Sequence, residues 1–429
     1  MKVGILGAGL TGLTLAAHLQ HDYDILEKED TVGGFCRSHF DQGFTFDIGG
    51  AHIMFSRNQE ILDYMVSLLG ENCVRGRREN KIFYSGKYVK YPFENGLFDL
   101  SPEERYECLY EFLYNEYPAP RNFKEWMYFT FGRAITEKYL LPYNEKVWNL
   151  SADQISLDWV KGRVPKPPVE DVIKAAVGVQ TEGYSHQLYF YYPKRGGIEA
   201  LTNALSSSCH NIHLGYAVQG IRRDQKQWVV TNGQIEKKYD TLVVTLPIHS
   251  IVSMLDEVPD EIKSATAALR YNSLITVMLG FDSQSLPDYT AVYFPQRNVR
   301  FNRISFPALF SSENVPQGKS AILVEITANP GDGILDLSDK ELIADVLRSL
   351  EGMGIVDCTK ICYQSVVRNK YAYIVNDIGY RENLQRVSEF ISASGIILCG
   401  RFAQFEYINM DECVERGLAL ARSLNEGVV

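Results

Sequence analysis

The chain has 429 residues, 45% of them hydrophobic, and a formal net charge of −10. This length predicts two or three domains with a large core, and the acidic balance argues against a nucleic-acid partner. The eight cysteines are scattered without a CxxC pair or a histidine cluster at metal spacing, so we expect free thiols, no metal site and a cytoplasmic location. Because the first expected strand begins at residue 2, we expect neither a presequence nor stable insertion into a membrane.

A short apolar strand is the first element predicted, and a glycine turn and a helix beginning near Leu10 follow it. Gly7, Gly9 and Gly12 have the GxGxxG spacing typical of dinucleotide-binding turns. Gly7 allows a tight turn, Gly9 lets the backbone approach a pyrophosphate, and Gly12 lets the helix pack closely on the sheet. The start of the helix, with Leu10 and Thr11, directs free N–H groups and a positive dipole end at that pyrophosphate.

An acid follows the second predicted strand, about 20 residues after the glycine turn. Glu27, with Lys28 beside it, lies where a ribose hydroxyl requires an acceptor. This favours an unphosphorylated adenosine ribose, as in FAD or NAD, over NADP. The order of strand, turn, helix and acid makes the signature much more specific than the glycines alone, but it leaves NAD and FAD both open.

A second glycine pair decides between these two cofactors. Gly33 and Gly34 follow the acid, and then comes Arg37, whose guanidinium could reach a pyrophosphate. A nicotinamide enzyme has no need of this pair, so the sequence predicts FAD. The segment continues through an apolar stretch to a third pair, Gly49 and Gly50.

From the acid to this third pair, the chain resembles a superfamily of FAD-binding enzymes that includes flavin amine oxidases, protoporphyrinogen oxidases and UDP-galactopyranose mutases. The resemblance implies that the first two glycine segments wrap the adenosine and pyrophosphate. It also implies that Gly49, Gly50, Ala51 and His52 reach the isoalloxazine. Without the resemblance, His52 is better explained as a hydrogen-bonded histidine of the core.

The far end of the chain resembles the same superfamily. A short apolar strand ends at Gly400 and Arg401, and Asn409 has an acid three residues later, which is the spacing of a capping box before a helix that begins near Met410. The resemblance implies that this helix directs its N-terminus at the flavin, where a positive dipole end stabilises the negative charge of the reduced ring. Asp411 in the first turn is expected to bring a backbone N–H to the flavin.

Two further features are predicted in the middle of the chain. A glycine pair at 196–197 and a helix lead to a strand over residues 212–221, where the resemblance implies that the backbone near Val218 contacts adenine. Asn232 and Gly233 between two apolar runs predict a hairpin with a type I′ turn.

The predicted fold class is mixed α/β, with a Rossmann-type FAD-binding domain that is discontinuous in sequence. Its segments are expected at 1–75, 190–265 and 376–429. An inserted substrate-binding domain takes up 76–189, which has helical patterns and many aromatic side chains. It also takes up 266–375, which has strand patterns such as SLITVMLGF and SAILVEITA.

Members of this superfamily use the flavin in two ways. Oxidases take a hydride from the substrate, whereas mutases keep the flavin reduced and use it as a nucleophile toward a sugar ring. The stretches that resemble the mutases are GAHIMFSRN, KYVKYPFENGL, NEKVWNL, FNRISFPALF, YAYIVND and GRFAQFEYINMD. This implies that Arg303 clamps a substrate diphosphate and that Tyr373 hydrogen-bonds its oxygens; taken alone, Arg303 fits a surface ion pair nearly as well.

Other positions depart from the mutase pattern. In the mutase pattern a second arginine binds the diphosphate, but this chain has Pro167 at that position, with Arg163 or Lys166 as candidate substitutes. The acid and the base expected after the first arginine are replaced by Phe306 and Ala308. The segment NMDECVERGLALA also resembles the ends of protoporphyrinogen oxidases, and YPKRGGIEALTNAL resembles those enzymes more closely.

We therefore favour a FAD-dependent oxidoreductase of the protoporphyrinogen-oxidase or amine-oxidase type, with hydride transfer from substrate to flavin N5. A UDP-galactopyranose-mutase-like enzyme is the alternative, and a non-catalytic FAD-binding protein is the least favoured class. The catalytic face is expected between His52 and Arg303, Tyr371 and Tyr373, with Phe405 as a further aromatic candidate. We expect a small-molecule substrate, which is a nucleotide sugar under the alternative, and a monomer or homodimer.

Overall fold

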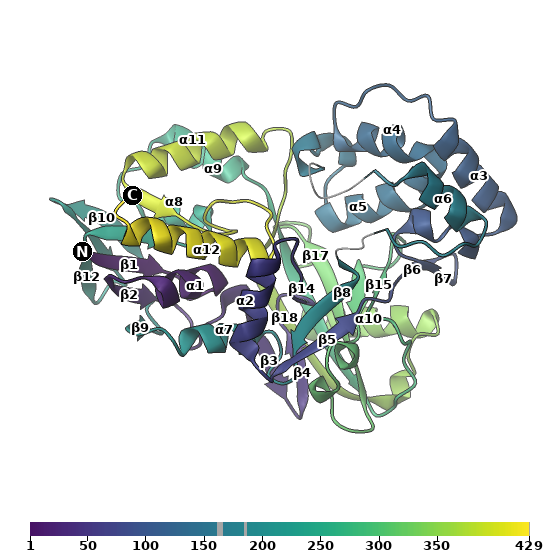
Figure 1. The fold of residues 1–429 in the computed structure, drawn as a ribbon, viewed down its shortest axis with the longest axis horizontal. Helices are drawn as coiled ribbons and strands as arrows, with labels where there is room; N and C mark the ends of the chain where they lie inside the picture. Colours follow the sequence, from purple (N-terminus) through teal and green to yellow (C-terminus); the bar gives the residue numbers. More distant parts are fainter. Residues whose placement is uncertain (161–165, 184–186, 429) are drawn as a thin grey trace.

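A parallel five-stranded sheet organises the part of the molecule that holds both chain ends (Figure 1). The computed structural model describes residues 1–160, 166–183 and 187–428. The strand order is β19-β13-β1-β2-β9, and every neighbouring pair is parallel. The predicted mixed α/β class with a Rossmann-type sheet is confirmed, and the strands come from three separate parts of the chain. They are β1 (Lys2–Leu6), β2 (Asp22–Leu26), β9 (Ile212–His213), β13 (Thr241–Val244) and β19 (Ile396–Leu398).

Helices cover both faces of this sheet. One face is covered by α1 (Leu10–His18), α2 (Gln59–Leu69), α7 (Glu199–Ser206) and α12 (Met410–Asn425). The other is covered by α8 (Ile248–Met254), α9 (Asp260–Ala268), α11 (Tyr380–Ala393) and a three-stranded antiparallel sheet of β10 (Gly220–Asp224), β11 (Gln227–Thr231) and β12 (Glu236–Tyr239).

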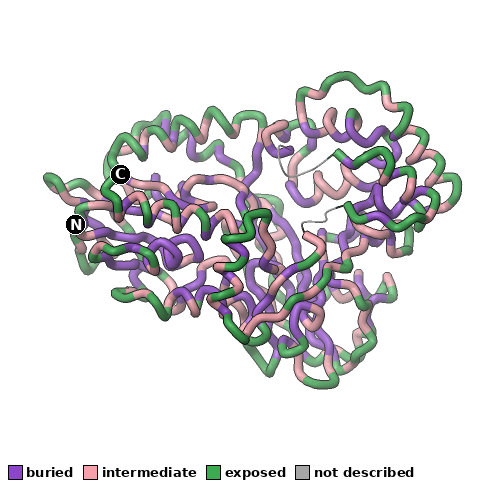
Figure 2. Tube along the Cα trace, in the orientation of Figure 1, coloured by how far each residue is buried: buried purple, intermediate pink, exposed green. Residues whose placement is uncertain are grey.

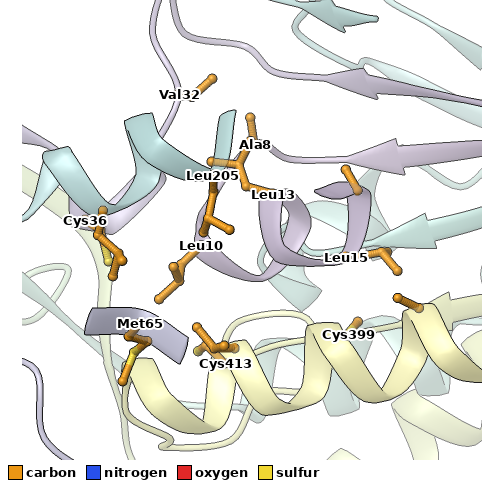
Figure 3. Packing of buried hydrophobic residues seen from close by; sticks show 14 of the residues in the cluster. Ala8, Leu10, Leu13, Leu15, Val32, Cys36, Met65, Leu205, Cys399 and Cys413 are labelled. Carbon is orange, nitrogen blue, oxygen red and sulfur yellow. The ribbon is translucent and has the colours of Figure 1, made fainter. Parts of the chain in front are cut away.

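Side chains of β1 alternate between these two layers, as strand geometry requires. Val3 and Ile5 join the cluster under α1 and α12, and Leu6 joins the cluster under the small sheet. Figure 3 shows the first cluster, with Leu10 of α1 and Cys413 of α12 directed into the same interior. The parallel sheet is therefore buried on both sides, which is the usual state of such sheets.

Two local predictions in this layer were wrong. No continuous strand covers residues 212–221; β9 ends at His213, and the chain turns at Gly215, which has a φ of +67°, before β10 begins. The hairpin between β11 and β12 exists, but its turn is not type I′. Four residues connect these strands, and the Asn232 side chain accepts hydrogen bonds from Gln234 N and Ile235 N at 3.0 and 2.8 Å. An Asx-type turn thus replaces the two-residue turn.

A mixed seven-stranded sheet forms the second large layer, in the order β18-β14-β17-β16-β15-β6-β7. The predicted strands are confirmed: SLITVMLGF is part of β14 and SAILVEITA is the whole of β17, and the two pair antiparallel over nine residue positions. Helix α10 (Asp339–Gly352) packs on one face, and the hairpin of β3 (Ser38–Asp41) and β4 (Phe44–Asp47) packs on the other. The strands are β6 (Asn80–Tyr84), β7 (Lys87–Lys90), β14 (Tyr271–Phe281), β15 (Ala291–Tyr293), β16 (Arg303–Ser305), β17 (Ser320–Ala328) and β18 (Ile361–Ile374).

Four helices form a separate lobe beyond this sheet (Figure 1). The lobe contains α3 (Pro102–Leu113), α4 (Phe123–Ile135), a π-helical turn (Thr136–Leu140), α5 (Leu141–Trp148) and α6 (Val169–Ala176). The helix expected from SPEERYECLYEFLYNEY is α3, which Ser101 caps by accepting a hydrogen bond from Glu104 N. Helices α3 and α4 meet closely at Gly132, where a Cβ would lie 2.4 Å from Glu111 O.

A two-stranded pair of β5 (Cys73–Arg77) and β8 (Tyr189–Pro193) completes the fold. Buried chain concentrates in the sheets, and exposed chain follows the outer helices (Figure 2). The cysteines have free thiols. Within the described residues, no helix is both long and apolar enough to cross a bilayer, and no group of three or more metal-ligating side chains gathers.

Candidate active site

A large cleft runs from the glycine turn after β1 to the helical lobe. Its volume is about 1160 Å³, which exceeds the roughly 300–1,000 Å³ of ordinary small-molecule pockets, so it has room for a dinucleotide and a second ligand. Most of the predicted site residues line it. They are Gly7, Gly9, Leu10, Thr11, Glu27, Lys28, Gly33, Gly34, Arg37, Gly49, Ala51, His52, Arg303, Tyr371, Tyr373, Arg401, Asn409, Met410 and Asp411.

Three predicted glycines lie behind the cleft wall and permit close packing. A Cβ at Gly12 would lie 2.1 Å from Gly7 O, one at Gly400 would lie 2.5 Å from Thr11 Oγ1, and one at Gly50 would lie 2.8 Å from a carboxylate oxygen of Glu325. These positions therefore hold the surrounding elements close enough to shape the cleft.

Several other candidates lie away from the wall. Val218 and Phe405 are buried in the cluster beneath the small sheet, so the adenine contact expected near Val218 stays a prediction. Pro167 is buried, Lys166 is exposed, and neither lines the cleft. Arg163 lies outside the described residues.

Of the three glycines of the GxGxxG motif, Gly9 is the one that borders open space. Gly7 has a φ of +105°, and its N–H donates to Leu26 O at 2.9 Å. A Cβ at Gly9, by contrast, would meet no described atom within 4 Å. Gly9 is also the N-cap of α1, so the free N–H groups of that helix border the open space. This is the geometry that a pyrophosphate requires.

Glu27 follows β2 directly and is buried with both carboxylate oxygens engaged. Oε2 accepts from Ala8 N at 2.8 Å, and Oε1 accepts from Glu29 N at 3.1 Å. Each oxygen has a second lone pair, so the carboxylate can still accept hydrogen bonds from ribose hydroxyls. The two backbone donors hold it at the cleft.

The second glycine pair adopts left-handed backbone, with φ of +111° at Gly33 and +55° at Gly34. Gly33 N donates to Ala8 O at 2.8 Å, which joins this segment to the first glycine turn. The Arg37 guanidinium lines the cleft and donates from Nε to Gly34 O at 3.1 Å. Its position fits the predicted contact with a pyrophosphate.

His52 is held as a neutral imidazole. Its Nδ1 lies 2.8 Å from Gly50 O, and because a carbonyl only accepts, Nδ1 carries the proton and Nε2 is an acceptor. Burial lowers the pKa of His52 to about 4; the hydrogen bond to Gly50 opposes this shift, and the positive charges of Arg401 and Arg303 add to it. His52 therefore fits both interpretations made from the sequence: it is a hydrogen-bonded histidine, and it also lines the cleft.

Arg303 forms a buried ion pair with Glu325, not the surface pair that was the alternative. Its Nε and Nη2 donate to the two carboxylate oxygens at 2.8 and 2.7 Å, and the Glu325 side chain is 0% exposed. Ala51 N also donates to Glu325 Oε1 at 3.3 Å. One carboxylate therefore links β16 of the second layer to the segment that carries His52.

The two predicted tyrosines of β18 lie in different surroundings. The Tyr371 ring packs 4.5 Å from the ring of Tyr271. The Tyr373 ring meets Trp148 edge to face at 6.1 Å and stacks on Tyr407 at 6.0 Å. Burial, with the Glu325 charge nearby, raises the pKa of Tyr373 well above its usual value, so its phenol stays a hydrogen-bond donor.

Helix α12 begins at Met410, as predicted, and its first turn lines the cleft. Asn409 N donates to Glu412 Oε2 at 3.1 Å. Asp411 Oδ2 accepts from Ser56 Oγ at 2.6 Å, while Asp411 Oδ1 and Arg401 Nε have no hydrogen-bond partner among the described residues. Buried polar atoms of this kind usually have a partner, which here would be a ligand.

Sequence reasoning missed several residues at this site. Glu325 carried a usable signal, because it is the sole charged residue of an otherwise uncharged strand pattern, and a buried charge needs a partner. Tyr143, Trp148 and Tyr407 carried none, since aromatic side chains in helices and loops are mostly core.

Comparisons with known proteins now identify the family. The model of the family described as flavin-containing amine oxidoreductase matches residues 10–425. The chain belongs to this family. Membership implies a flavin cofactor, and the predicted superfamily is confirmed.

The solved structures that resemble this chain include a mutase and proteins described as oxidases. Among solved structures, a reduced UDP-galactopyranose mutase matches with a TM-score of 0.91 and 25% identity over 100% of this chain and 96% of that chain. A protein assigned as a protoporphyrinogen oxidase from Exiguobacterium sp. 255-15 has a TM-score of 0.78 and 19% identity over 99% of both chains. Cyclohexylamine oxidase from Brevibacterium oxydans has a TM-score of 0.69 and 14% identity, over 100% of this chain and 99% of that one.

Curated sequences match over shorter stretches. The UDP-galactopyranose mutase of Mycoplasma pneumoniae is 23% identical over 54% of this chain and 59% of its own length. A 4,4'-diapophytoene desaturase of Staphylococcus aureus is 44% identical over 13% of this chain and 11% of its own length. This chain therefore covers less than two thirds of either relative.

The glycine turn predicts opposite effects for two substitutions. Gly9→Val should leave the fold intact, because its backbone is extended and its surroundings are open, but it should abolish flavin binding. Gly12→Val should instead destabilise the apoprotein, because the side chain collides with Gly7 O. Bound flavin per protein and urea unfolding of the apoproteins measure the two effects. A full flavin complement in Gly9→Val would contradict this assignment.

Removal of the buried Glu325 carboxylate is expected to destabilise the fold. Glu325→Ala leaves the partly buried Arg303 guanidinium and Ala51 N without their acceptor, so it should lower the free energy of unfolding by about 1–3 kcal/mol. Glu313→Ala is the control, because its exposed pair with Arg195 should contribute about 0–1 kcal/mol. Urea denaturation measures both, and equal losses in the two variants would refute the structural role of Glu325.

His52 should make stability depend on pH. Its folded pKa lies below the unfolded value, so its contribution is present near neutral pH and is lost as the pH falls from about 6.5 toward 4. Between about pH 7 and 5 the wild-type apoprotein should lose up to about 2 kcal/mol more than His52→Gln. Urea unfolding at both pH values tests this, and parallel losses would count against a neutral buried imidazole.

Proposed function

We propose that the protein is a FAD-dependent mutase that interconverts the pyranose and furanose rings of a nucleotide sugar. The similarity to reduced UDP-galactopyranose mutase carries this proposal, because it extends over the whole chain at a TM-score of 0.91. The oxidase-type structures are less similar and lie below 25% identity. The order of the two functions favoured from the sequence is therefore reversed.

FAD is the flavin that the cleft fits best. The open space at Gly9 suits a pyrophosphate, the Glu27 carboxylate suits an adenosine ribose, and the N-terminus of α12 with Asp411 suits the flavin ring. We propose the FAD-binding domain at 1–75, 190–265 and 376–429, and the substrate-binding domain at 76–189 and 266–375.

The remaining half of the cleft suits an anionic, hydroxyl-bearing substrate. Arg303 pairs with Glu325 through Nε and Nη2, so Nη1 is the group through which it would bind a phosphate oxygen. The Tyr373 phenol would donate to the same diphosphate, and neutral His52 offers Nε2 as an acceptor. Bound reduced FAD would supply a nucleophilic nitrogen for attack at the anomeric carbon of the sugar.

Oxidation of a small apolar or amine substrate is the second candidate. The observation that favours it is that, within the described part of the chain, Lys166 and Pro167 do not line the cleft and so supply no second cation for a diphosphate. The aromatic side chains of Trp148, Tyr373 and Tyr407, which do line the cleft, suit such a substrate equally well.

The redox state of the flavin separates the two functions. The dithionite-reduced protein should interconvert UDP-galactopyranose and UDP-galactofuranose without net loss of electrons, whereas the air-oxidised protein should not. Chromatography of the nucleotide sugars measures this. Rapid oxygen consumption with an amine or a porphyrinogen, and no ring interconversion, would establish oxidation instead.

Arg303 provides the local test of the same proposal. Arg303→Lys keeps the charge beside Glu325 but loses the planar fork, so UDP affinity of the reduced protein should fall about tenfold or more. Arg300→Ala is the control, because Arg300 pairs with Asp345 away from the cleft. Isothermal calorimetry measures both affinities, and unchanged UDP binding in Arg303→Lys would show that Arg303 is not the diphosphate ligand.

A further inference from the structure

Helix α3 carries a row of exposed tyrosines on the outer side of the helical lobe (Figure 1). Tyr106, Tyr110 and the C-cap Tyr114 follow one another at four-residue spacing, which places them on one helix face. Their side chains are 68%, 49% and 69% exposed. The ring centroids lie 5.7 Å apart for the first pair and 4.9 Å apart for the second. Because Cys108 and Phe112 on the opposite face fill the core of the lobe, the tyrosine row is left to face solvent.

The apolar surface continues beyond the end of α3. Leu113 and Tyr117 are each 41% exposed, and Phe129 of the neighbouring helix α4 is 40% exposed. Asn115 joins the two segments, because its Nδ2 donates to the carbonyl groups of Tyr128 and Phe129, each at 2.8 Å. The six exposed side chains lie outside the cleft wall and are called the tyrosine face here; they are Tyr106, Tyr110, Leu113, Tyr114, Tyr117 and Phe129.

The area of the tyrosine face suits the core of a protein interface. A whole aromatic side chain has roughly 150–250 Å² of surface, so the exposed parts of the six side chains amount to about 600 Å². This equals the largest apolar patch expected on a monomer, which is about 300–600 Å². Each partner of a standard interface buries roughly 800 Å², with an apolar core inside a polar rim. The tyrosine face therefore supplies most of one side of such an interface.

Two acids that flank the tyrosine row are already paired within the lobe. Glu107 pairs with Lys138 at 2.9 Å, and Glu111 pairs with Arg133 of α4. In a contact between two identical faces, each flank meets an equally charged flank, which is costly unless the charges are neutralised beforehand. The intrachain ion pairs meet this condition.

The remaining exposed charges argue against a lipid surface as the partner. Glu103 and Glu116 lie beyond the two ends of the tyrosine row, and both are exposed. An anionic bilayer attracts lysine and arginine and would repel these acids. Between two protein copies the same acids lie at the rim, where water and salt screen their repulsion.

We propose that the tyrosine face is the core of a two-fold interface with a second copy of this chain. The row is symmetric about Tyr110, because Tyr106 and Tyr114 lie four residues before and after it. A two-fold axis beside Tyr110 packs α3 antiparallel against α3 of the second copy, with Tyr106 of each copy opposite Tyr114 of the other. Tyrosine is among the residues that contribute most to interface energies. The surface is separate from the cleft, so this assignment holds for either candidate function.

Sedimentation of the FAD-loaded protein from about 0.1 to 50 μM tests the interface. The wild type should sediment as a dimer in this range. Tyr110→Asp should raise the dimer dissociation constant about 100-fold or more, because the axis brings two carboxylates together. Phe40→Asp is the control, because Phe40 of β3 is 51% exposed but lies outside the helical lobe, and it should sediment like the wild type. Flavin content verifies that each variant is folded.

A cross-link provides a second test that does not depend on weakening the dimer. Cys362→Ser first removes the exposed native thiol. In this background Tyr110→Cys should form a covalent dimer when diamide oxidises the thiols, because a two-fold axis brings position 110 of both copies within disulfide reach. Phe40→Cys in the same background should remain monomeric on a denaturing gel.

Three results would overturn the assignment. One is a wild type that stays monomeric up to 50 μM, and another is a dimer that Tyr110→Asp leaves intact. The third is a wild type that floats with vesicles of phosphatidylcholine and phosphatidylglycerol while Tyr110→Asp does not, since that result would make a lipid surface the partner of the tyrosine face.

Discussion

The Glu325 carboxylate fixes the geometry on which the site depends. It is fully buried in β17 of the mixed sheet, and it accepts from the Arg303 guanidinium on β16 and from Ala51 N on the segment before His52. A buried charge is stable only with such donors, so the carboxylate compels two layers to meet at one point. Gly50 is required there, since a Cβ would lie 2.8 Å from a Glu325 oxygen.

The cleft follows from this junction. On one side, the parallel sheet presents two helix N-termini, those of α1 and α12, to the same space. On the other side, β16, β18 and the helical lobe contribute Arg303, the tyrosines and Glu94. The half that we propose for the cofactor presents glycines and backbone N–H groups together with the side chains of Glu27 and Arg37, whereas the half that we propose for the substrate presents mainly side chains. Family members can therefore share the flavin while differing in substrate.

The parts of the molecule that were predictable from sequence are those encoded locally. Each of these features lies within a few residues of the backbone that it shapes: the turn at Gly7, Gly9 and Gly12, the acid at Glu27 and the cap of α12. In the structure they line the same cleft, except Gly12, which packs behind its wall. Long-range pairings were not visible, because nothing near Arg303 in sequence indicates Glu325. The strand expected over 212–221 failed for a related reason, since the chain leaves the sheet at Gly215 once β9 has paired with β2.

A crystal structure of the reduced, FAD-loaded protein with UDP tests the central claim most directly. We predict the pyrophosphate of FAD against Gly9, the flavin ring between His52 and the start of α12, and the UDP diphosphate on Arg303 in the same cleft. A structure in which FAD fills the cleft alone, or in which UDP binds away from Arg303, would contradict the account.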